Sequence, residues 1–103
     1  MGTNELRINN YVLFSEDSTI FQVGEIHNLG LTVENEDECT WIEIDQFEPI
    51  PLTEEWLVKF GEIKFLSKDV GGYFIWFNGR KIYIKFVHSL QNFYFCIEQK
   101  ELI

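Results

Sequence analysis

The chain has 103 residues, a formal net charge of −9, 46% hydrophobic residues and 17% aromatic residues. A chain of this length is expected to form one domain, residues 1–103, and can bury a core without disulfides or metals. So much apolar material excludes a disordered chain, and the apolar runs are too short to span a bilayer.

The charge is unevenly divided along the chain. Residues 1–58 contain thirteen acidic residues and a single basic one, Arg7, giving −12. Residues 59–103 contain four acidic and seven basic residues, giving +3. An acidic half of this strength repels nucleic-acid phosphates and attracts basic surfaces. The alternative interpretation is that the acidity only keeps an aromatic-rich protein soluble.

Residues 1–52 have the pattern of short strands joined by tight turns, because apolar and polar residues alternate with a period of two. The predicted strands are 11–14, 19–26, 29–34, 40–45 and 47–52. In this pattern Leu29, Ile42 and Ile44 face the core. Strands this short and closely connected predict an SH3-like small β-barrel or a bent antiparallel sheet.

The turn between the third and fourth predicted strands is crowded with carboxylates. Residues 34–45 contain no basic residue, and their acids are Glu34, Glu36, Asp37, Glu38, Glu43 and Asp45. Their spacing does not fit a calcium loop, which needs alternating acids and a central glycine. We therefore expect these six residues to act collectively as an acidic protein-binding surface.

A short helix is predicted over 53–60, where the second part of the domain (53–103, helix, hairpin and helix) begins. Thr53 can cap free backbone N–H groups, and Glu54 and Glu55 suit the positive end of the helix dipole. Gly61 is a candidate left-handed C-cap.

The strongest local signal is a β-hairpin over 73–86, preceded by a predicted strand over 62–66. Asn78-Gly79 tolerates the positive φ angles of a type I′ turn, so Phe77 is expected opposite Arg80. The predicted core face carries Tyr73, Ile75, Phe77, Ile82 and Ile84. The other face carries Phe74, Trp76, Lys81, Tyr83 and Lys85. Aromatic residues interleaved with lysines can stack bases and contact phosphates, so this is an alternative, nucleic-acid-binding face.

The last predicted element is a C-terminal helix over 88–100, within an amphipathic stretch. Its apolar stripe is Val87, Leu90, Tyr94 and Ile97, and the polar residues His88, Gln91, Asn92 and Gln99 lie off that stripe. His88 is the best candidate for polar chemistry. The favoured interpretation is that it caps the helix start or hydrogen-bonds across to the barrel.

Three blocks of the chain together resemble a known family. They are "LRINNYV" (6–12), "EPIPLTEEWLVKFG" (48–61) and "FVHSLQNFYF" (86–95) with the following "EL" (101–102). They are similar to blocks in small uncharacterised proteins of Bacteroidota genomes, phages and mobile elements. The chain departs from that pattern at Asn9 and Asn10, where the family has Ile-Gly-Asn and a tight glycine turn. The resemblance implies a cytoplasmic location in a bacterial host and carries over no activity.

No catalytic or metal-binding motif is recognisable in the sequence: GxSxG, a P-loop and HExxH are all missing. Cys39, Cys96, His27 and His88 lack the close spacing of a zinc site, and both cysteines are expected to be free thiols. We therefore expect no enzyme activity, no catalytic residue, no bound metal and no cofactor.

These observations predict a small acidic α+β protein, associated with phages or mobile elements, that binds other proteins without catalysis. The expected partner is a nucleic-acid enzyme or ribonucleoprotein with a basic surface, such as an RNA-guided nuclease, which the protein would inhibit or modulate. Direct nucleic-acid binding and membrane association are not expected. The first alternative is a nucleic-acid-binding accessory factor that uses the hairpin face, and the second is a small hydrolase or metal-dependent enzyme.

Overall fold

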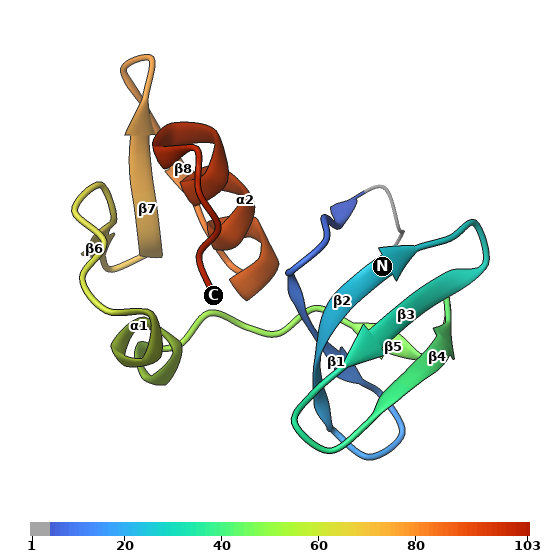
Figure 1. The fold of residues 1–103 in the computed structure, drawn as a ribbon. Coiled ribbons are helices and arrows are strands. Elements are labelled where there is room, and N and C mark those ends of the chain that lie inside the picture. Colours follow the sequence, from blue (N-terminus) through green and yellow to red (C-terminus); the bar gives the residue numbers. More distant parts are fainter. Residues whose placement is uncertain (1–4) are drawn as a thin grey trace.

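The computed structural model describes residues 5–103, which form two antiparallel sheets and two helices in an α+β arrangement (Figure 1). None of the helices in this described part has the length and apolar character needed to cross a bilayer. In chain order the elements are β1 (Tyr11–Phe14), β2 (Ile20–Ile26), β3 (Gly30–Glu34), β4 (Cys39–Glu43), β5 (Phe47–Glu48), α1 (Glu54–Phe60), β6 (Ser67–Asp69), β7 (Gly72–Phe77), β8 (Arg80–Tyr83) and α2 (Val87–Glu98).

The first five strands form one curled antiparallel sheet in the order β4-β3-β2-β1-β5. The register between β2 and β3 shifts between Val23 and Glu25, and an irregularity of this kind bends a strand. The concave side encloses a core of buried apolar residues: Leu6, Val12, Phe21, Val23, Leu31, Val33, Ile42 and Phe47. The prediction of a bent antiparallel sheet is confirmed.

Two residues predicted to face this core lie outside it. Leu29 is 74% exposed, because the chain turns at 27–29, where the His27 N–H bonds the Gly30 carbonyl, and β3 begins only at Gly30. Ile44 is 40% exposed, because β4 ends at Glu43 and a second turn follows. The fifth strand is also shorter than predicted and contains only Phe47 and Glu48.

A tight turn precedes β1. Asn9 has a φ of 78°, and the Asn10 N–H bonds the Arg7 carbonyl at 3.1 Å. Asparagine is one of the few residues that visit the left-handed region routinely. Asn9 therefore supplies the positive φ that a glycine turn would need at this point.

The helix α1 begins after Thr53, close to the predicted position, but its start differs in detail. The Thr53 side chain makes no capping hydrogen bond, and the Thr53 carbonyl instead accepts bonds from the N–H groups of Trp56 and Leu57. At the other end Gly61 has a φ of 89° and a ψ of −169°. The positive φ explains the glycine, but the conformation is extended and not left-handed helical.

The strand predicted over 62–66 is wrong. This stretch is irregular, and the first strand of the second sheet is Ser67–Asp69 instead. Ile63, Phe65 and Leu66 are partly buried against the second core, in a segment where Leu66 N–H bonds the Ile63 carbonyl. Packing on several sides of an irregular segment produces an apolar run that looks like a strand in sequence.

The predicted register of the hairpin is confirmed. Phe77 pairs with Arg80 and Trp76 with Lys81, and the two turn residues, Asn78 and Gly79, have φ angles of 53° and 76°. One predicted core residue is wrong, since Phe77 is 51% exposed at the end of the hairpin. In Figure 1 this end extends beyond α2, so nothing covers it there.

The helix α2 buries most of the predicted stripe, because Val87 and Leu90 are buried and Tyr94 packs against the second core, and it also buries two polar residues predicted to lie off that stripe. Its buried residues are Val87, His88, Leu90 and Gln91, whereas Ile97 is 45% exposed. Leu90 joins Ile75, Ile84 and Leu102 in the second core. A third cluster, with Ile50, Trp56 and Val87 buried at its centre, packs against Tyr11 and Leu13 of β1 and so connects the two sheets.

Candidate protein-binding surface

The six predicted acidic residues do not converge on one point. Glu36, Asp37 and Glu38 lie in the turn between β3 and β4, whereas Glu43 ends β4 and Asp45 lies in the turn after it. Four steps along an extended strand separate Cys39 from Glu43 by about 13 Å. The acidic surface therefore has two groups, one at each end of β4.

The turn group is held by its own asparagine. Asn35 Oδ1 accepts hydrogen bonds from the N–H groups of Asp37 and Glu38, both at 2.9 Å, and the Asn35 N–H bonds the Glu38 carbonyl. The backbone of this turn is thus satisfied without the carboxylates. The side chains of Glu36, Asp37 and Glu38 are left on the exposed surface.

The second group is held in a similar way. Gln46 Oε1 accepts a bond from the Glu43 N–H at 2.9 Å, and the Gln46 N–H bonds the Glu43 carbonyl at the same distance. Glu43 and Asp45 are both exposed. Again an amide side chain closes the turn, and the carboxylates remain free to contact a partner.

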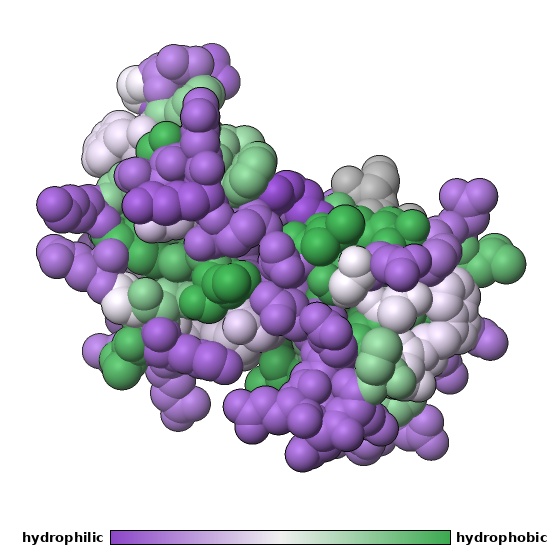
Figure 2. Space-filling view, in the orientation of Figure 1, coloured by the Kyte–Doolittle hydropathy of each residue, from purple (hydrophilic) through white to green (hydrophobic). Residues whose placement is uncertain are grey.

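Within residues 5–103, none of the six carboxylates forms an ion pair. The single base of the N-terminal half, Arg7, is bound to Glu101, with Nη1 3.0 Å from Oε1, and its guanidinium lies over the Phe95 ring at 3.6 Å. Figure 2 shows hydrophilic residues gathered at the lower end of the N-terminal sheet, where the turns after β1 and β3 lie in Figure 1. The carboxylates of the acidic surface are therefore not neutralised by a direct ion pair among residues 5–103.

A surface groove of about 580 Å³ lies beside the first acidic turn. Its floor includes a cross-strand row on the convex face of the sheet, in which Tyr11 pairs with Gln22 and Gln22 pairs with Glu34. Glu36 and Asp37 line the groove from the turn, and Lys59 of α1 lines it as well. The groove therefore combines aromatic and amide side chains with three carboxylates and the ammonium group of Lys59.

The groove residues outside the acidic segment were not predicted. Tyr11, Gln22 and Lys59 come from β1, β2 and α1, and the register between β1 and β2 could have placed the first two on one face. Lys59 Nζ lies 4.6 Å from the ring centroid of Trp56 and 5.1 Å from that of Tyr11. The contact with Tyr11 could not be predicted from local patterns, because the two residues are far apart in the sequence.

The alternative hairpin face differs from its prediction. Phe74 is buried, at 6% exposure, whereas Trp76, at 62%, and Tyr83, at 42%, are exposed. Lys81 Nζ bonds Asp69 Oδ2 at 2.7 Å, and Tyr83 donates to the same carboxylate at 3.0 Å. The hydrogen bond from Lys81 lowers the pKa of Asp69, and the bond to Asp69 raises the pKa of Tyr83.

This arrangement reduces the positive charge that the hairpin face offers to phosphates. Asp69 neutralises Lys81 on the face itself, so the exposed Lys85 is the remaining lysine of the predicted set. Binding of single-stranded nucleic acid combines stacking with a positively charged groove, and only the stacking partner is clearly present.

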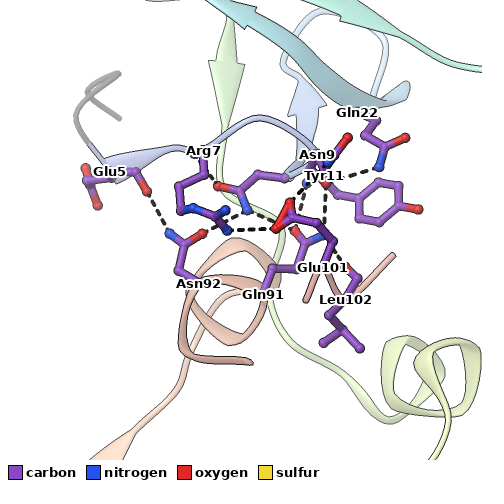
Figure 3. Close-up of polar contacts among 10 residues, drawn as sticks. Glu5, Arg7, Asn9, Tyr11, Gln22, Gln91, Asn92, Glu101 and Leu102 are labelled. Atoms are coloured by element: carbon purple, nitrogen blue, oxygen red, sulfur yellow. Dashed lines mark hydrogen bonds and ion pairs between the residues drawn. The ribbon is translucent and has the colours of Figure 1, made fainter. Parts of the chain in front are cut away.

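A polar cluster that sequence patterns did not reveal joins the N-terminal segment to α2 (Figure 3). Gln91 is 3% exposed, and its Oε1 accepts the Tyr11 N–H at 2.9 Å. Its Nε2 donates to the carbonyls of Asn9 and Leu102 at 3.0 and 2.8 Å. Beside it, Asn10 donates to Asn92 Oδ1 at 3.0 Å and accepts the Arg7 N–H at 2.7 Å. These side chains connect backbone segments, which is a structural role.

His88 does not cap the helix or bond to the sheet as predicted. It is 3% exposed, its Nδ1 has no hydrogen-bond partner within the described residues, and its ring stacks on Phe86 at 5.8 Å. Burial lowers the pKa of His88, an effect partly opposed by the nearby Glu5 carboxylate. Its ring is buried against Phe86 and makes no hydrogen bond through Nδ1 among residues 5–103.

No group of three or more His, Cys, Asp and Glu side chains within residues 5–103 is arranged to hold a metal ion. Cys39 and Cys96 are free thiols, as predicted, and both are exposed. The chain matches no protein-family model, and comparisons with curated proteins and with solved structures also find no match.

Proposed function

We propose that the chain is a non-enzymatic binding protein whose acidic N-terminal sheet docks against a basic surface of another protein. The observation that carries the proposal is the set of six exposed carboxylates at the two ends of β4, none of which is ion-paired within residues 5–103. A protein gains nothing in stability from such crowded like charges, since they repel one another.

The proposed partner is a nucleic-acid enzyme or a ribonucleoprotein, such as an RNA-guided nuclease, whose basic groove normally binds phosphates. A dense carboxylate surface competes for the same arginines and lysines, and complementary charge accelerates association. The protein would therefore inhibit or modulate its partner by occupying the nucleic-acid site. The net charge of −9 supports a protein partner over direct binding to nucleic acid.

The proposal includes a fold and a setting. The N-terminal sheet is an SH3-like unit within a single domain. The strand order supports that assignment, because β1 to β4 form a meander and β5 returns to pair with β1. The resemblance of the three sequence blocks supports membership of the Bacteroidota, phage and mobile-element family and a place in the bacterial cytoplasm.

The test is a displacement assay with an RNA-guided nuclease and a fluorescently labelled guide or target. Adding the protein at low salt should release the labelled nucleic acid, and raising the salt should weaken this effect because exposed charges are screened. The triple variant Glu36→Lys, Asp37→Lys, Glu38→Lys should release much less of the labelled nucleic acid than the natural protein does.

A pull-down from a bacterial lysate at low salt widens this test to other partners. Enrichment of basic nucleic-acid enzymes by the natural protein, and not by the triple variant, is the expected result. The proposal fails if neither the displacement assay nor the pull-down detects a basic nucleic-acid-binding protein.

A further inference from the structure

The strand β4 is an edge of the N-terminal sheet and pairs only with β3 among the strands. Its five residues, Cys39–Glu43, are all exposed except Ile42. Thr40 is exposed even though it pairs with the buried Val33. The curled sheet is therefore open along this edge.

The hydrogen-bond register shows which backbone groups are unused. The Asn35 N–H bonds the Glu38 carbonyl and the Ile44 N–H bonds the Leu29 carbonyl, one at each end of the β3–β4 pair. Hydrogen-bonded pairs alternate along an antiparallel ladder. Thr40 and Ile42 therefore bond to β3, whereas the N–H and C=O groups of Cys39, Trp41 and Glu43 point away from it.

Of these three residues, Glu43 already has partners, because Gln46 bonds both its N–H and its carbonyl. Cys39 and Trp41 have no such backbone partner within residues 5–103. The free edge thus presents two N–H and two C=O groups, spaced as an added strand would need them.

Trp41 is positioned as an anchor on this edge. Its ring is 45% exposed, lies 5.0 Å from the His27 ring, and passes so close to Gly30 that a Cβ there would be 2.9 Å from Cζ2. A braced and exposed tryptophan loses little conformational freedom on binding, which is typical of residues that dominate protein interfaces.

The charge around the edge selects the occupant. β4 contains no lysine and no proline, the residues that commonly protect an edge strand from pairing. It carries Glu43 instead, with Glu38 before it, Asp45 after it and Glu34 beside Cys39 on β3. These acids repel a second copy of the chain, and they attract a strand that carries lysine or arginine.

We propose that β4 binds an extended basic segment of the partner protein, which adds to the sheet as a further strand paired through Cys39 and Trp41. This inference rests on the proposed function and specifies how the basic partner is recognised. Residues of the added strand opposite Trp41 and Glu43 share the outer face with them and are two apart. Arginine opposite Trp41 would stack on the indole, and a basic residue opposite Glu43 would pair with it.

The test uses two synthetic peptides with the same alternating arginine–valine sequence, one unmodified and one N-methylated at alternate backbone nitrogens. The methyl groups are placed on the arginine nitrogens, which are the ones that would face β4 with arginine opposite Trp41. Both peptides have the same charge and side chains, but only the first can pair through Cys39 and Trp41 in this register. Titration of the isotopically labelled full chain, followed by NMR, should show slowed hydrogen exchange of the Cys39 and Trp41 amides with the unmodified peptide alone. Its affinity should exceed that of the methylated peptide by about tenfold or more.

Two matched variants of the chain test the same edge. Cys39→Pro removes an outward N–H at a position where an edge strand tolerates proline, and Cys39→Ala keeps that N–H. We expect Cys39→Pro to reduce affinity for the unmodified peptide by about fivefold or more, while Cys39→Ala binds as the natural protein does. Far-ultraviolet circular dichroism checks that both variants are folded.

The outcomes separate strand addition from simple charge attraction. Equal binding of the two peptides without amide protection would overturn strand addition and leave the proposed function intact. Failure of both peptides to bind at low salt would contradict both proposals. Protection of Cys39 and Trp41 that grows with protein concentration in the absence of peptide would show that the occupant is a second copy, and would also overturn the inference.

Discussion

The two halves of the molecule use their charged residues differently. In the second half Asp69 bonds Lys81 and Tyr83, and Glu101 reaches back to Arg7, so charges hold parts of the chain together. In the N-terminal sheet the carboxylates at both ends of β4 are exposed, and amide side chains of Asn35 and Gln46 close the turns instead. This difference is the reason why we propose the acidic sheet, and not the second half, as the surface that contacts a partner.

The largest effect is expected from breaking the contact between the two halves at Gln91. Replacing it by alanine removes three hydrogen bonds, those to the Tyr11 N–H and to the carbonyls of Asn9 and Leu102, in a site that is almost fully buried. Gln91→Ala should lower the free energy of unfolding by about 3 kcal/mol. Urea denaturation measures this change.

Gln22→Ala is the matched control, because Gln22 also donates to the Asn9 carbonyl but is only half-buried. Gln22→Ala should lower the free energy of unfolding by well under half as much as Gln91→Ala does. Equal losses in the two variants would mean that Gln91 does not have the central role assigned to it.

A smaller loss of stability is expected within the acidic sheet at Gly30. A Cβ at this position would lie 2.2 Å from the Ile42 carbonyl oxygen, so Gly30→Ala forces β3 and β4 apart. We expect a loss of about 2 kcal/mol in the free energy of unfolding. Gly24→Ala is the control, since its Cβ would lie 3.5 Å from the Thr32 carbonyl, an ordinary contact distance. A Gly30→Ala variant as stable as Gly24→Ala would contradict this packing.

The smallest of the three effects concerns His88 and pH. Burial lowers its pKa in the folded state below the unfolded value of about 6.5. The unfolded chain then binds the proton more readily, so stability is greatest above pH about 6.5 and falls as the pH drops through the folded pKa. Urea midpoints measured from neutral to mildly acidic pH should show this fall.

Replacing His88 by glutamine should flatten that profile. If the variant keeps the slope of the natural protein, another group is responsible for it.

Local sequence patterns predicted the hairpin and the strands of the first sheet. Asn78-Gly79 determined the hairpin register, and the alternation around Phe21 and Leu31 located the strands of the first sheet. The burial of Gln91 on α2 was not predicted, because this side chain bonds backbone groups around residue 10, some eighty positions away. A prediction from hydrophobic periodicity puts polar side chains on the surface. It cannot identify a buried polar side chain whose hydrogen-bond partners are distant in the sequence.

The candidate surface was also predicted only in part, because its shape depends on contacts between distant segments. The six acids were identified from sequence, but their division between the two ends of β4 follows from strand length and register. The unpaired backbone of Cys39 and Trp41 depends on which strands are edges, and this is a property of the whole sheet. Composition predicted the charge of the surface, and topology determined its shape.

The most direct test asks whether binding of a basic peptide depends on where the negative charges lie, and not only on the net charge. One variant carries Glu36→Gln, Asp37→Asn and Glu38→Gln, and the other carries Glu54→Gln, Glu62→Gln and Glu98→Gln, at exposed positions outside the acidic surface. Both lose the same charge. The measurement is the affinity for an arginine-rich peptide at about 50 mM and about 200 mM salt.

We expect the first variant to bind the peptide several-fold more weakly, with a shallower dependence on salt, while the second binds nearly as the natural protein does. Equal weakening in both variants would mean that only net charge attracts the peptide. That result would contradict the central claim that the ends of β4 form a specific protein-binding surface.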